Sequence, residues 1–587
     1  EAHRSTGDGS DTEGMLQSIR KAIPNAAWVG YTGTPRFEGQ KTKEVFGSLL
    51  HAYTIKHAIA DHNVLGFNVE FKETIEPMEN PSEEDIDHMI RASVYDTDPV
   101  HVELVVQDVL YNWKEKSINY KYNALFTVHV GGNKPSIPRA MEYFDKFMEE
   151  NQKLEERPLK IAIIFSADTS NSDSQLQTNE SLDRALLSYN QMFGTAFDRT
   201  TLKAYSEDLA RRLNKTADDR NYLDLVIVVD QLLTGFDAPE LNTLYVDRTL
   251  KGGNLIQAYS RTNRIHNSEY KTWGNIVNYR WPKQNEYEMN KAFAVYSDRH
   301  SADELIDGNI KDKIISKPFS AAVNDMKDLV DELRDLTDNF DRIPPSEEDQ
   351  NELFEKLKNY NRLMTQLKQY TIDEEGNRVS AYDAPEEFYD RIGMTPEDEI
   401  KLTVVIADEL KRLKAKQEKV DISHIELSMV QINEVRINYD YLVDLIAKMA
   451  DEIYAHQKED AEVTRIEINV EIAKSDNEEE KEKMRRFVEA IYSGDFVFDS
   501  YPAPRTVEAM DRARERAVAK SNTREVADFV RKWGLDNSTL VKDLLALIEK
   551  HSIGQDDLDK QGEISAILNS ARADYQELAE PDIAELS

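Results

Sequence analysis

The sequence contains no cysteine and no long apolar run. The absence of cysteine among 587 residues excludes disulfides, thiolate metal sites and a cysteine nucleophile. No stretch approaches the roughly 20 uninterrupted apolar residues of a membrane helix, and the mean hydropathy is -0.63. The composition therefore excludes a membrane protein and fits a cytoplasmic one.

Basic residues are also scarce. Lys and Arg total 73 against 110 Asp and Glu, which gives a net charge of -37 and an isoelectric point near 4.8. Nonspecific nucleic-acid binding needs Lys and Arg to replace the counterions of the phosphates. The charge therefore argues against a simple nucleic-acid-coating protein, but not against a local basic groove. At about 100–200 residues per domain, the length predicts roughly three folding units.

A phosphate-binding P-loop is missing from the printed sequence as well. A search for Gly-x-x-x-x-Gly-Lys-Ser/Thr finds no match: Gly39–Thr42 has an extra residue between Gly and Lys, and Gly131–Pro135 places proline where a hydroxyl ligand is needed. The chain opens on Glu1 without an initiator Met and without a signal peptide. We therefore expect a piece cut from a longer chain.

Residues of the first half alternate between short apolar runs and helical stretches, which is typical of parallel strands joined by crossover helices. The expected strands are Ala27–Tyr31, Ala124–Val130, Lys160–Phe165, Asp224–Asp230, Thr243–Asp247 and Asn275–Tyr279. The expected helices are Arg139–Glu150, Ser181–Met192, Tyr205–Leu213 and Asn254–Arg264. The sequence thus predicts a doubly wound α/β domain.

Beyond about Ser301 the apolar residues recur at helical spacing. Helices are expected around 323–336 and 353–367, with Ser346 as a helix N-cap, and at Thr395–Lys416, Tyr439–His456, Glu478–Tyr492, Pro504–Lys520 and Ser538–Lys550. The alternation of Ile466, Ile468, Val470 and Ile472 leaves a short strand possible there. The second half is predicted to be all-α.

Three patches in the first half could carry chemistry. Glu1-Ala2-His3 would complete an Asp-Glu-Ala-His box if one Asp preceded it, and it is followed after the first expected strand by Thr32-Gly33-Thr34-Pro35. Leu232–Pro239 follows the buried strand Asp224–Asp230, at the sheet edge where open α/β sheets bind ligands. Taken alone, each of these matches is weak, and the second is equally well a tight strand-to-helix turn.

The third patch is Gln257–Arg264, in which Arg261 and Arg264 are expected on one face of a helix. Two guanidinium groups aimed the same way suit a triphosphate, and one can act as an arginine finger. An isolated pair of this kind is more often a solvated basic stripe. The order and spacing of all three patches favour the nucleotide interpretation.

In that order, the patches resemble motifs II, III, V and VI of superfamily 2 helicases and translocases, which contain RecA-like motor domains. The residues within and around these motifs more specifically resemble the R (HsdR) subunit of type I restriction enzymes. The segments that carry this resemblance are Gly30–Phe37, Val45–Gly47, His51–Ile55, Ala58–Asp61, Leu241–Asp247 and Ala258–Ile265. The resemblance covers residues 1–280 strongly and the helical half only in general character.

The resemblance implies a role for each matching residue. Glu1 matches the water-activating glutamate and Arg264 the arginine finger, so these two would be catalytic. The remaining matches fall into two groups. Those near the nucleotide are Gly235, Asp237, Gln257 and Arg261, and those that couple ATP to DNA or touch its backbone are Thr32, Thr34 and Thr234, with Ala124–Val130 as the motif IV strand.

From the resemblance we expect a remnant of a first motor domain in residues 1–75, a second RecA-like motor domain in 76–295 and a helical assembly domain in 296–587. The intact protein would use ATP and Mg²⁺ to translocate duplex DNA, would assemble with modification (M) and specificity (S) subunits, and would cleave DNA with a nuclease upstream of the Walker motif. The printed chain itself is expected to be inactive, because Walker A and the nuclease are absent from it. Two alternatives stay open: another superfamily 2 DNA motor, such as a type III restriction or repair translocase, and a non-catalytic assembly module.

Overall fold

The protein is described by a computed structural model. It describes residues 15–35, 42, 47–48, 50–74, 95, 98–129, 136–154, 157–164, 173–229, 238–266, 271–298, 314–420, 422–427, 429–432, 439–475 and 477–517. Contacts divide the chain into two compact units, each of which is treated by itself. Unit 1 consists of Glu1–Leu336 and Asn351–Thr395, and unit 2 of Thr337–Gln350 and Pro396–Ser587.

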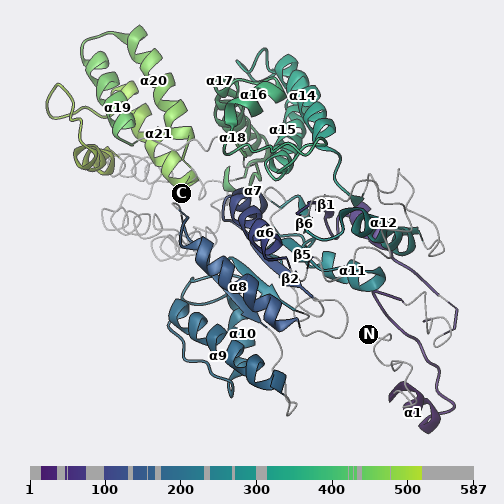
Figure 1. Ribbon diagram of the computed structural model, residues 1–587. Coiled ribbons are helices and arrows are strands. Elements are labelled where there is room, and N and C mark those ends of the chain that lie inside the picture. Colours follow the sequence, from purple (N-terminus) through teal and green to yellow (C-terminus); the bar gives the residue numbers. More distant parts are fainter. Residues whose placement is uncertain are drawn as a thin grey trace, which may run out of the picture. The chain divides into compact units, whose positions relative to one another are not determined.

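Unit 1 is built on a six-stranded parallel sheet in the order β1-β6-β5-β2-β4-β3 (Figure 1). The strands are β1 (Gly66–Phe71), β2 (Asn123–Val128), β3 (Ile161–Ile164), β4 (Leu225–Val228), β5 (Leu241–Asp247) and β6 (Trp273–Asn278). Every residue of β2 through β6 is buried. Continuous apolar runs such as Leu225–Val228 form these strands because both faces of the sheet are covered.

Helices precede the central strands or connect them. α6 (Pro99–Tyr111) and α8 (Ile137–Asn151) lie side by side against the sheet (Figure 1). The remaining helices of this part are α1 (Met15–Ala22), α3 (Ile55–Ala60), α7 (Trp113–Ser117), α9 (Asp173–Phe193), α10 (Leu202–Leu213), α11 (Gly252–Tyr259) and α12 (Pro282–Asp298). The start of α6 follows from its sequence, because the Asp98 carboxylate accepts a hydrogen bond from Val100 N at 2.8 Å and Pro99 occupies the first helical position.

Helical residues from the second half of the chain complete unit 1. They form α14 (Phe319–Leu336), most of α15 (Glu347–Leu367) and α16 (Pro385–Ile392). The Ser346 hydroxyl accepts a hydrogen bond from Asp349 N at 3.0 Å, as its predicted N-cap role requires. Unit 1 therefore contains both the α/β sheet and the first helices of the helical half.

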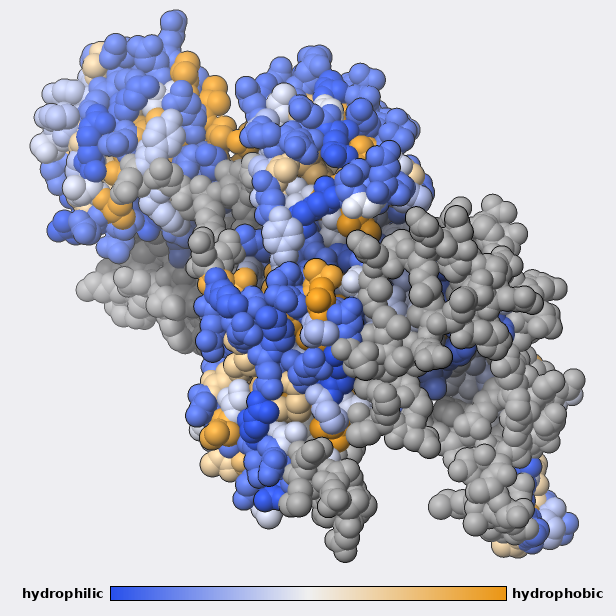
Figure 2. Space-filling model, viewed as in Figure 1, coloured by the Kyte–Doolittle hydropathy of each residue, from blue (hydrophilic) through white to orange (hydrophobic). Residues whose placement is uncertain are grey.

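All the regular secondary structure in the described residues of unit 2 is helical. Its elements are α17 (Pro396–Ile400), a π-helix at Lys401–Ile406, α18 (Ala407–Glu418), a 3₁₀ turn at Ile422–His424, α19 (Tyr439–Tyr454), α20 (Lys458–Ala473) and α21 (Glu478–Ser493). An apolar core joins α19, α20, α21 and residues up to Ala517. Among the coloured residues of Figure 2, hydrophilic side chains predominate and apolar side chains form small separate groups.

The predicted architecture, a parallel α/β domain followed by a helical region, is confirmed. Two local predictions are wrong. Residues Ala27–Tyr31 form no strand: Tyr31 is 82% exposed, and no described strand lies beside them to supply the ladder of hydrogen bonds. The alternating run Ile466–Ile472 lies within helix α20, which buries Thr464, Ile468 and Ile472 at helical spacing and leaves Ile466 57% exposed.

β1 was not expected from the sequence. It lies within residues 1–75 and pairs along its whole length with β6, from residues 76–295, so one sheet takes strands from both predicted ranges. The segment Ser538–Lys550 lies outside the described residues. Within the described part of the chain, no helix is both long enough and apolar enough to span a lipid bilayer.

Candidate functional site

Three of the predicted site residues meet on one side of α11. The Gln257 Nε2 group donates a hydrogen bond to the Thr34 hydroxyl, and Thr34 N donates to the Thr32 hydroxyl at 3.2 Å. Thr34 is only 7% exposed although the short segment around it has no regular secondary structure. The Thr-Gly-Thr-Pro segment and the Gln257–Arg264 segment, more than 220 residues apart in the sequence, thus form one contact.

Two further residues complete this contact. The Tyr296 hydroxyl, on α12, donates to the Pro35 carbonyl at 2.8 Å. A Cβ atom on Gly253 would lie 2.9 Å from the Tyr296 hydroxyl and 3.3 Å from Thr34 Cβ, so the absence of a side chain allows the close approach. We call Thr34, Pro35, Gly253, Gln257 and Tyr296 the motif contact.

Sequence reasoning missed Tyr296 and Gly253. The Gly252-Gly253 pair at the start of α11 was a usable signal, because glycine in a helix is costly unless another group comes close. Tyr296 gave no such signal, since it lies 261 residues from the carbonyl to which it donates. Only the packing of α12 against α11 brings it there.

The two predicted arginines lie beyond the helix. α11 ends at Tyr259, and backbone bonds from Arg261 N to Ala258 O (3.1 Å) and from Thr262 N to Tyr259 O (3.0 Å) close a tight turn. The Thr262 hydroxyl also donates to Tyr259 O at 2.9 Å. The prediction that Arg261 and Arg264 share one face of a helix is therefore wrong, because a local side-chain bond competes with the helical ladder. Both arginines are half-buried.

This turn is held tightly to the sheet. Leu65, just before β1, donates its N–H to Asn263 O at 2.8 Å and accepts from the Asn263 side chain at 3.2 Å. A Cβ on Gly274 of β6 would lie 2.1 Å from the Thr262 hydroxyl and 2.8 Å from its carbonyl carbon. Glycine at 274 is thus required for the turn to lie against the strand, and the position of the arginines follows from it.

Four predicted site residues lie outside the described residues: Glu1, Thr234, Gly235 and Asp237. The last described residue before the 230–237 segment is Val229, whose carbonyl accepts from Arg248 NH1 at 2.7 Å. The structure therefore brings together Thr32, Thr34 and Gln257, and places Arg261 and Arg264 in the turn that follows the helix of Gln257.

A second polar cluster lies at the carboxyl end of β5. The fully buried Asp247 carboxylate receives Arg280 Nε at 2.6 Å and NH2 at 2.9 Å, His101 Nε2 at 2.8 Å and the Tyr143 hydroxyl at 2.8 Å. Burial raises the pKa of Asp247, but Arg280 and His101 outweigh burial and hold that pKa well below its usual range. The carboxylate is therefore charged.

Thr74 extends this cluster to a hydroxyl–imidazole–carboxylate series, with Thr74 Oγ1 2.6 Å from His101 Nδ1. The Thr74 hydroxyl also donates to the Tyr279 carbonyl at 3.4 Å. The Arg280 guanidinium pairs with the same carboxylate that His101 contacts. The cluster is a structural tie between the end of β5 and the segment after β1.

Family models match nearly the whole chain in three pieces. "Type I restriction enzyme subunit R domain 3" matches residues 120–281, and "Type I restriction and modification enzyme, subunit R C terminal" matches residues 314–580. A model described as "SWI2/SNF2 ATPase" matches residues 1–100.

Curated relatives agree with these matches. The chain is 32% identical over 485 residues to the type I restriction enzyme SauCOLORF180P endonuclease subunit of Staphylococcus aureus (strain COL), covering 79% of this chain and 48% of the relative. It is 32% identical to the SsaAORF53P endonuclease subunit of Staphylococcus saprophyticus, covering 76% of this chain and 46% of that protein. The chain thus spans about half the length of the curated relatives it matches.

Among solved structures, a fragment of a putative HsdR subunit from Vibrio vulnificus YJ016 aligns at a TM-score of 0.25 and 15% identity, over 49% of this chain and 44% of that one. A likeness at this level is too weak to inform the arrangement of the chain.

Proposed function

Because the chain belongs to the family of type I restriction enzyme R subunits, we propose that it supplies a motor domain and the helical region of an ATP-driven translocase of duplex DNA. One observation carries the proposal: the motif contact, in which Gln257 donates to Thr34. The two segments that would connect ATP hydrolysis to DNA movement are in direct contact through neutral hydrogen bonds. Such hydrogen bonds are weak enough to break and re-form during a cycle of ATP hydrolysis.

The proposed roles follow from the positions around α11. Arg264 would act as the arginine finger and Arg261 would contact the γ-phosphate, both from the turn that Asn263 and Thr262 hold against the sheet. Gln257 lies one helical turn earlier and touches Thr34. A displacement of the arginines on phosphate release would therefore reach the Thr-Gly-Thr-Pro segment through a single short helix, with Thr32 and Thr34 on the DNA side.

The described residues do not themselves form a nucleotide cradle. The sequence has no P-loop, and Glu1, Thr234, Gly235 and Asp237 lie outside the described part. Among the residues that the structure describes, no group of three His, Asp or Glu side chains could hold a metal ion. We therefore assign ATP and Mg²⁺ to the complete gene product and derive no hydrolytic step from this chain.

The same proposal covers the partners. Duplex DNA would be the track, and the helical region would dock on the modification and specificity subunits, with cleavage by a nuclease that this chain does not contain. A non-catalytic assembly role for the chain by itself is the second candidate, and the missing P-loop favours it. The type III or repair translocase alternative has no observation of its own in its favour.

ATP hydrolysis, measured with and without duplex DNA, tests the proposal. The assay compares this chain with the complete product of its gene. We expect duplex-stimulated turnover by the complete product and none by this chain alone. Arg264→Ala should abolish turnover, whereas the matched control Arg184→Ala, which removes an exposed arginine paired with Asp145, should leave it unchanged.

Three outcomes would each contradict one part of the proposed function. Turnover by this chain alone would contradict the claim that it lacks the phosphate cradle. Full activity of Arg264→Ala would remove the finger assignment. A complete product with no duplex-stimulated turnover, but with retained binding to its partner subunits, would favour the assembly role.

A further inference from the structure

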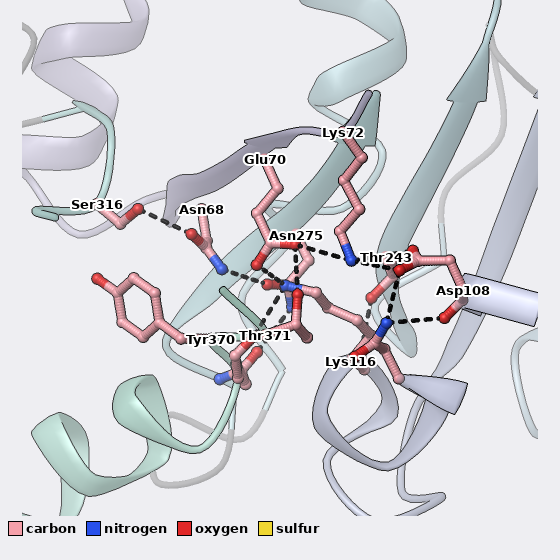
Figure 3. A network of polar contacts seen from close by, with 12 residues as sticks. Asn68, Glu70, Lys72, Asp108, Lys116, Thr243, Asn275, Ser316, Tyr370 and Thr371 are labelled. Atoms are coloured by element: carbon pink, nitrogen blue, oxygen red, sulfur yellow. Dashed lines mark hydrogen bonds and ion pairs between the residues drawn. The ribbon is translucent and has the colours of Figure 1, made fainter. Parts of the chain in front are cut away.

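A buried ion pair lies on the face of the sheet in unit 1. Lys116 of α7 and Glu70 of β1 meet with Nζ and Oε1 2.5 Å apart, and their side chains are only 1% and 6% exposed (Figure 3). Burial raises the pKa of Glu70, but the ammonium groups of Lys116 and Lys72 outweigh burial, so that its pKa is lowered. Burial lowers the pKa of the Lys116 ammonium group, and Glu70 only partly offsets that effect. The short Nζ–Oε1 contact and the hydrogen bonds to both groups favour the ionised pair. Charges this deep are tolerated only when hydrogen bonds satisfy them completely.

Residues from the helical half of the chain supply those hydrogen bonds. Lys116 Nζ donates to the Gln369 carbonyl at 2.8 Å, and the Thr371 hydroxyl donates to the second Glu70 oxygen at 2.7 Å. Both partners lie in the segment that follows α15, more than 250 residues from Lys116 and 300 from Glu70. This segment is thus the specific complement of the ion pair.

Neutral side chains extend the network across three strands. The Gln369 side-chain oxygen accepts from Asn275 of β6 at 2.7 Å, and Asn68 of β1 donates to Asn275 at 3.0 Å. Ser316 closes the series by donating to Asn68 at 2.9 Å, and Asn242 of β5 donates to the Lys116 carbonyl at 2.8 Å. We call the ion pair, Gln369, Thr371 and these side chains the joint.

Backbone contacts support the joint at the edge of the sheet. Ser316 N donates to the Phe67 carbonyl at 2.7 Å, and Ile315 forms a parallel bridge with Phe67. A Cβ on Gly66 would lie 2.9 Å from the Ile314 carbonyl oxygen, so no side chain fits between the two backbones. The helical half therefore covers the open edge of β1 before its first long helix begins.

A second clamp lies beside the joint. The buried Glu115 carboxylate accepts from the Ser380 hydroxyl at 2.6 Å and pairs with Arg378 at 3.2 Å. The Arg378 guanidinium also lies 3.8 Å from the centre of the Tyr111 ring. Residues 369–380 are thus fixed to α6 and α7 at both ends.

We infer that residues 314–336 and 351–395 are mechanically part of the α/β sheet, because the joint makes α14, α16 and the part of α15 that belongs to unit 1 a rigid extension of it. The family models divide the chain between residues 281 and 314, but the buried network crosses that division. The contact-defined unit 1 ends at Thr395. This inference does not depend on the proposed function.

Hydrogen exchange of the unmodified chain, measured in a urea series by mass spectrometry, tests the inference. If the joint holds, the slowest amides of α15 and α16 and those of β5 and β6 open together, with the same rate and the same urea dependence. Exchange in α15 and α16 at least about 100-fold faster than in β5 and β6 would overturn the inference.

Variants test the joint itself. Lys116→Met should release the helices, so that α14–α16 exchange at least about 100-fold faster than the sheet. The matched control Lys356→Met, which removes a more exposed lysine paired with Glu332, should change exchange by less than about 3-fold. If Lys116→Met does not fold, Thr371→Val is the alternative variant, because it removes one hydroxyl donor and keeps the shape of the side chain. Thr371→Val should speed hydrogen exchange in α15 and α16 by about 10-fold. Equal exchange in helices and sheet in a folded Lys116→Met variant would contradict the inference.

Discussion

The motif contact and the joint both connect distant parts of unit 1, yet they differ in strength and character. The motif contact consists of neutral hydrogen bonds around a segment without regular structure. The joint contains a buried ion pair whose hydrogen bonds join three separate parts of the chain. A neutral hydrogen bond contributes about 0.5–1.5 kcal/mol, whereas breaking a buried ion pair from one side costs about 3–5 kcal/mol.

This difference separates the parts that could rearrange from the parts that could not. A contact of about 1 kcal/mol per bond opens readily at room temperature. Opening of the joint would leave a buried charge without its partner. The joint therefore opens only when the structure around it unfolds. Thr34 and Gln257, two of the predicted site residues, thus belong to the weakly held contact, whereas none of the predicted site residues belongs to the strongly held joint.

The largest expected effect comes from breaking the joint. Lys116→Met leaves the Glu70 carboxylate buried without its nearest ammonium group, and it should lower the free energy of unfolding of unit 1 by about 3–5 kcal/mol in urea denaturation. The double variant Glu70→Leu with Lys116→Met should recover most of that loss, because no unpaired charge remains. A loss below about 1 kcal/mol in the single variant would show that the pair is not a structural determinant.

Asp247 provides a pH-dependent counterpart to the joint. Its pKa in the folded state is held below the unfolded value of about 3.9. Its stabilisation is therefore fully present above about pH 4 and is lost as the pH falls below that value. Asp247→Asn should cost about 3 kcal/mol at pH 7, and the free energy of unfolding, measured between pH 2.5 and 7, should fall less steeply with acid. If the free energy of unfolding of the variant fell as steeply with acid as that of the unmodified protein, other carboxylates would dominate acid unfolding.

In the motif contact, Gly253→Ala should separate the two segments with little loss of global stability. The added Cβ crowds Thr34 and the Tyr296 hydroxyl, while alanine gains about 0.5–1 kcal/mol of helix propensity over glycine. We expect hydrogen exchange at residues 26–35 to rise about 10-fold. Asn254→Ala, on the exposed side of the same turn, is the control and should leave that exchange unchanged.

The smallest expected effect is that of Tyr296→Phe. This change removes only the hydroxyl that donates to the Pro35 carbonyl, and it should cost about 0.5–1.5 kcal/mol. The loss should be confined to the Thr-Gly-Thr-Pro segment, as measured by hydrogen exchange of that segment against β5. If Tyr296→Phe destabilised the whole of unit 1 as strongly as Lys116→Met, the contrast between the two contacts would be wrong.

Local pattern determined several features of this protein without help from tertiary structure. The continuous apolar run at Leu225–Val228 fixed β4, because only a strand covered on both faces needs such a run. Ser346 after two prolines fixed the start of α15 through its side-chain bond to Asp349 N. The motif segments also singled out Thr34 as a coupling residue and Gln257 as a residue near the nucleotide, and in the structure the two side chains are in contact.

Tertiary structure decided the rest, for physical reasons that no local window contains. Ala27–Tyr31 has the composition of a strand but no described neighbour with which to pair. Of the alternating residues of α20, only Ile468 and Ile472, one helical turn apart, are buried in the core with α19 and α21. α11 ends before Arg261 because the Thr262 hydroxyl caps Tyr259 O and lies against Gly274. The sequence by itself thus determined the fold class and the motif residues, whose signals are periodic or contiguous. Lys116 and Tyr296 acquired their partners only through folding, since a buried charge or hydroxyl is satisfied by groups that the chain brings from 250 residues away.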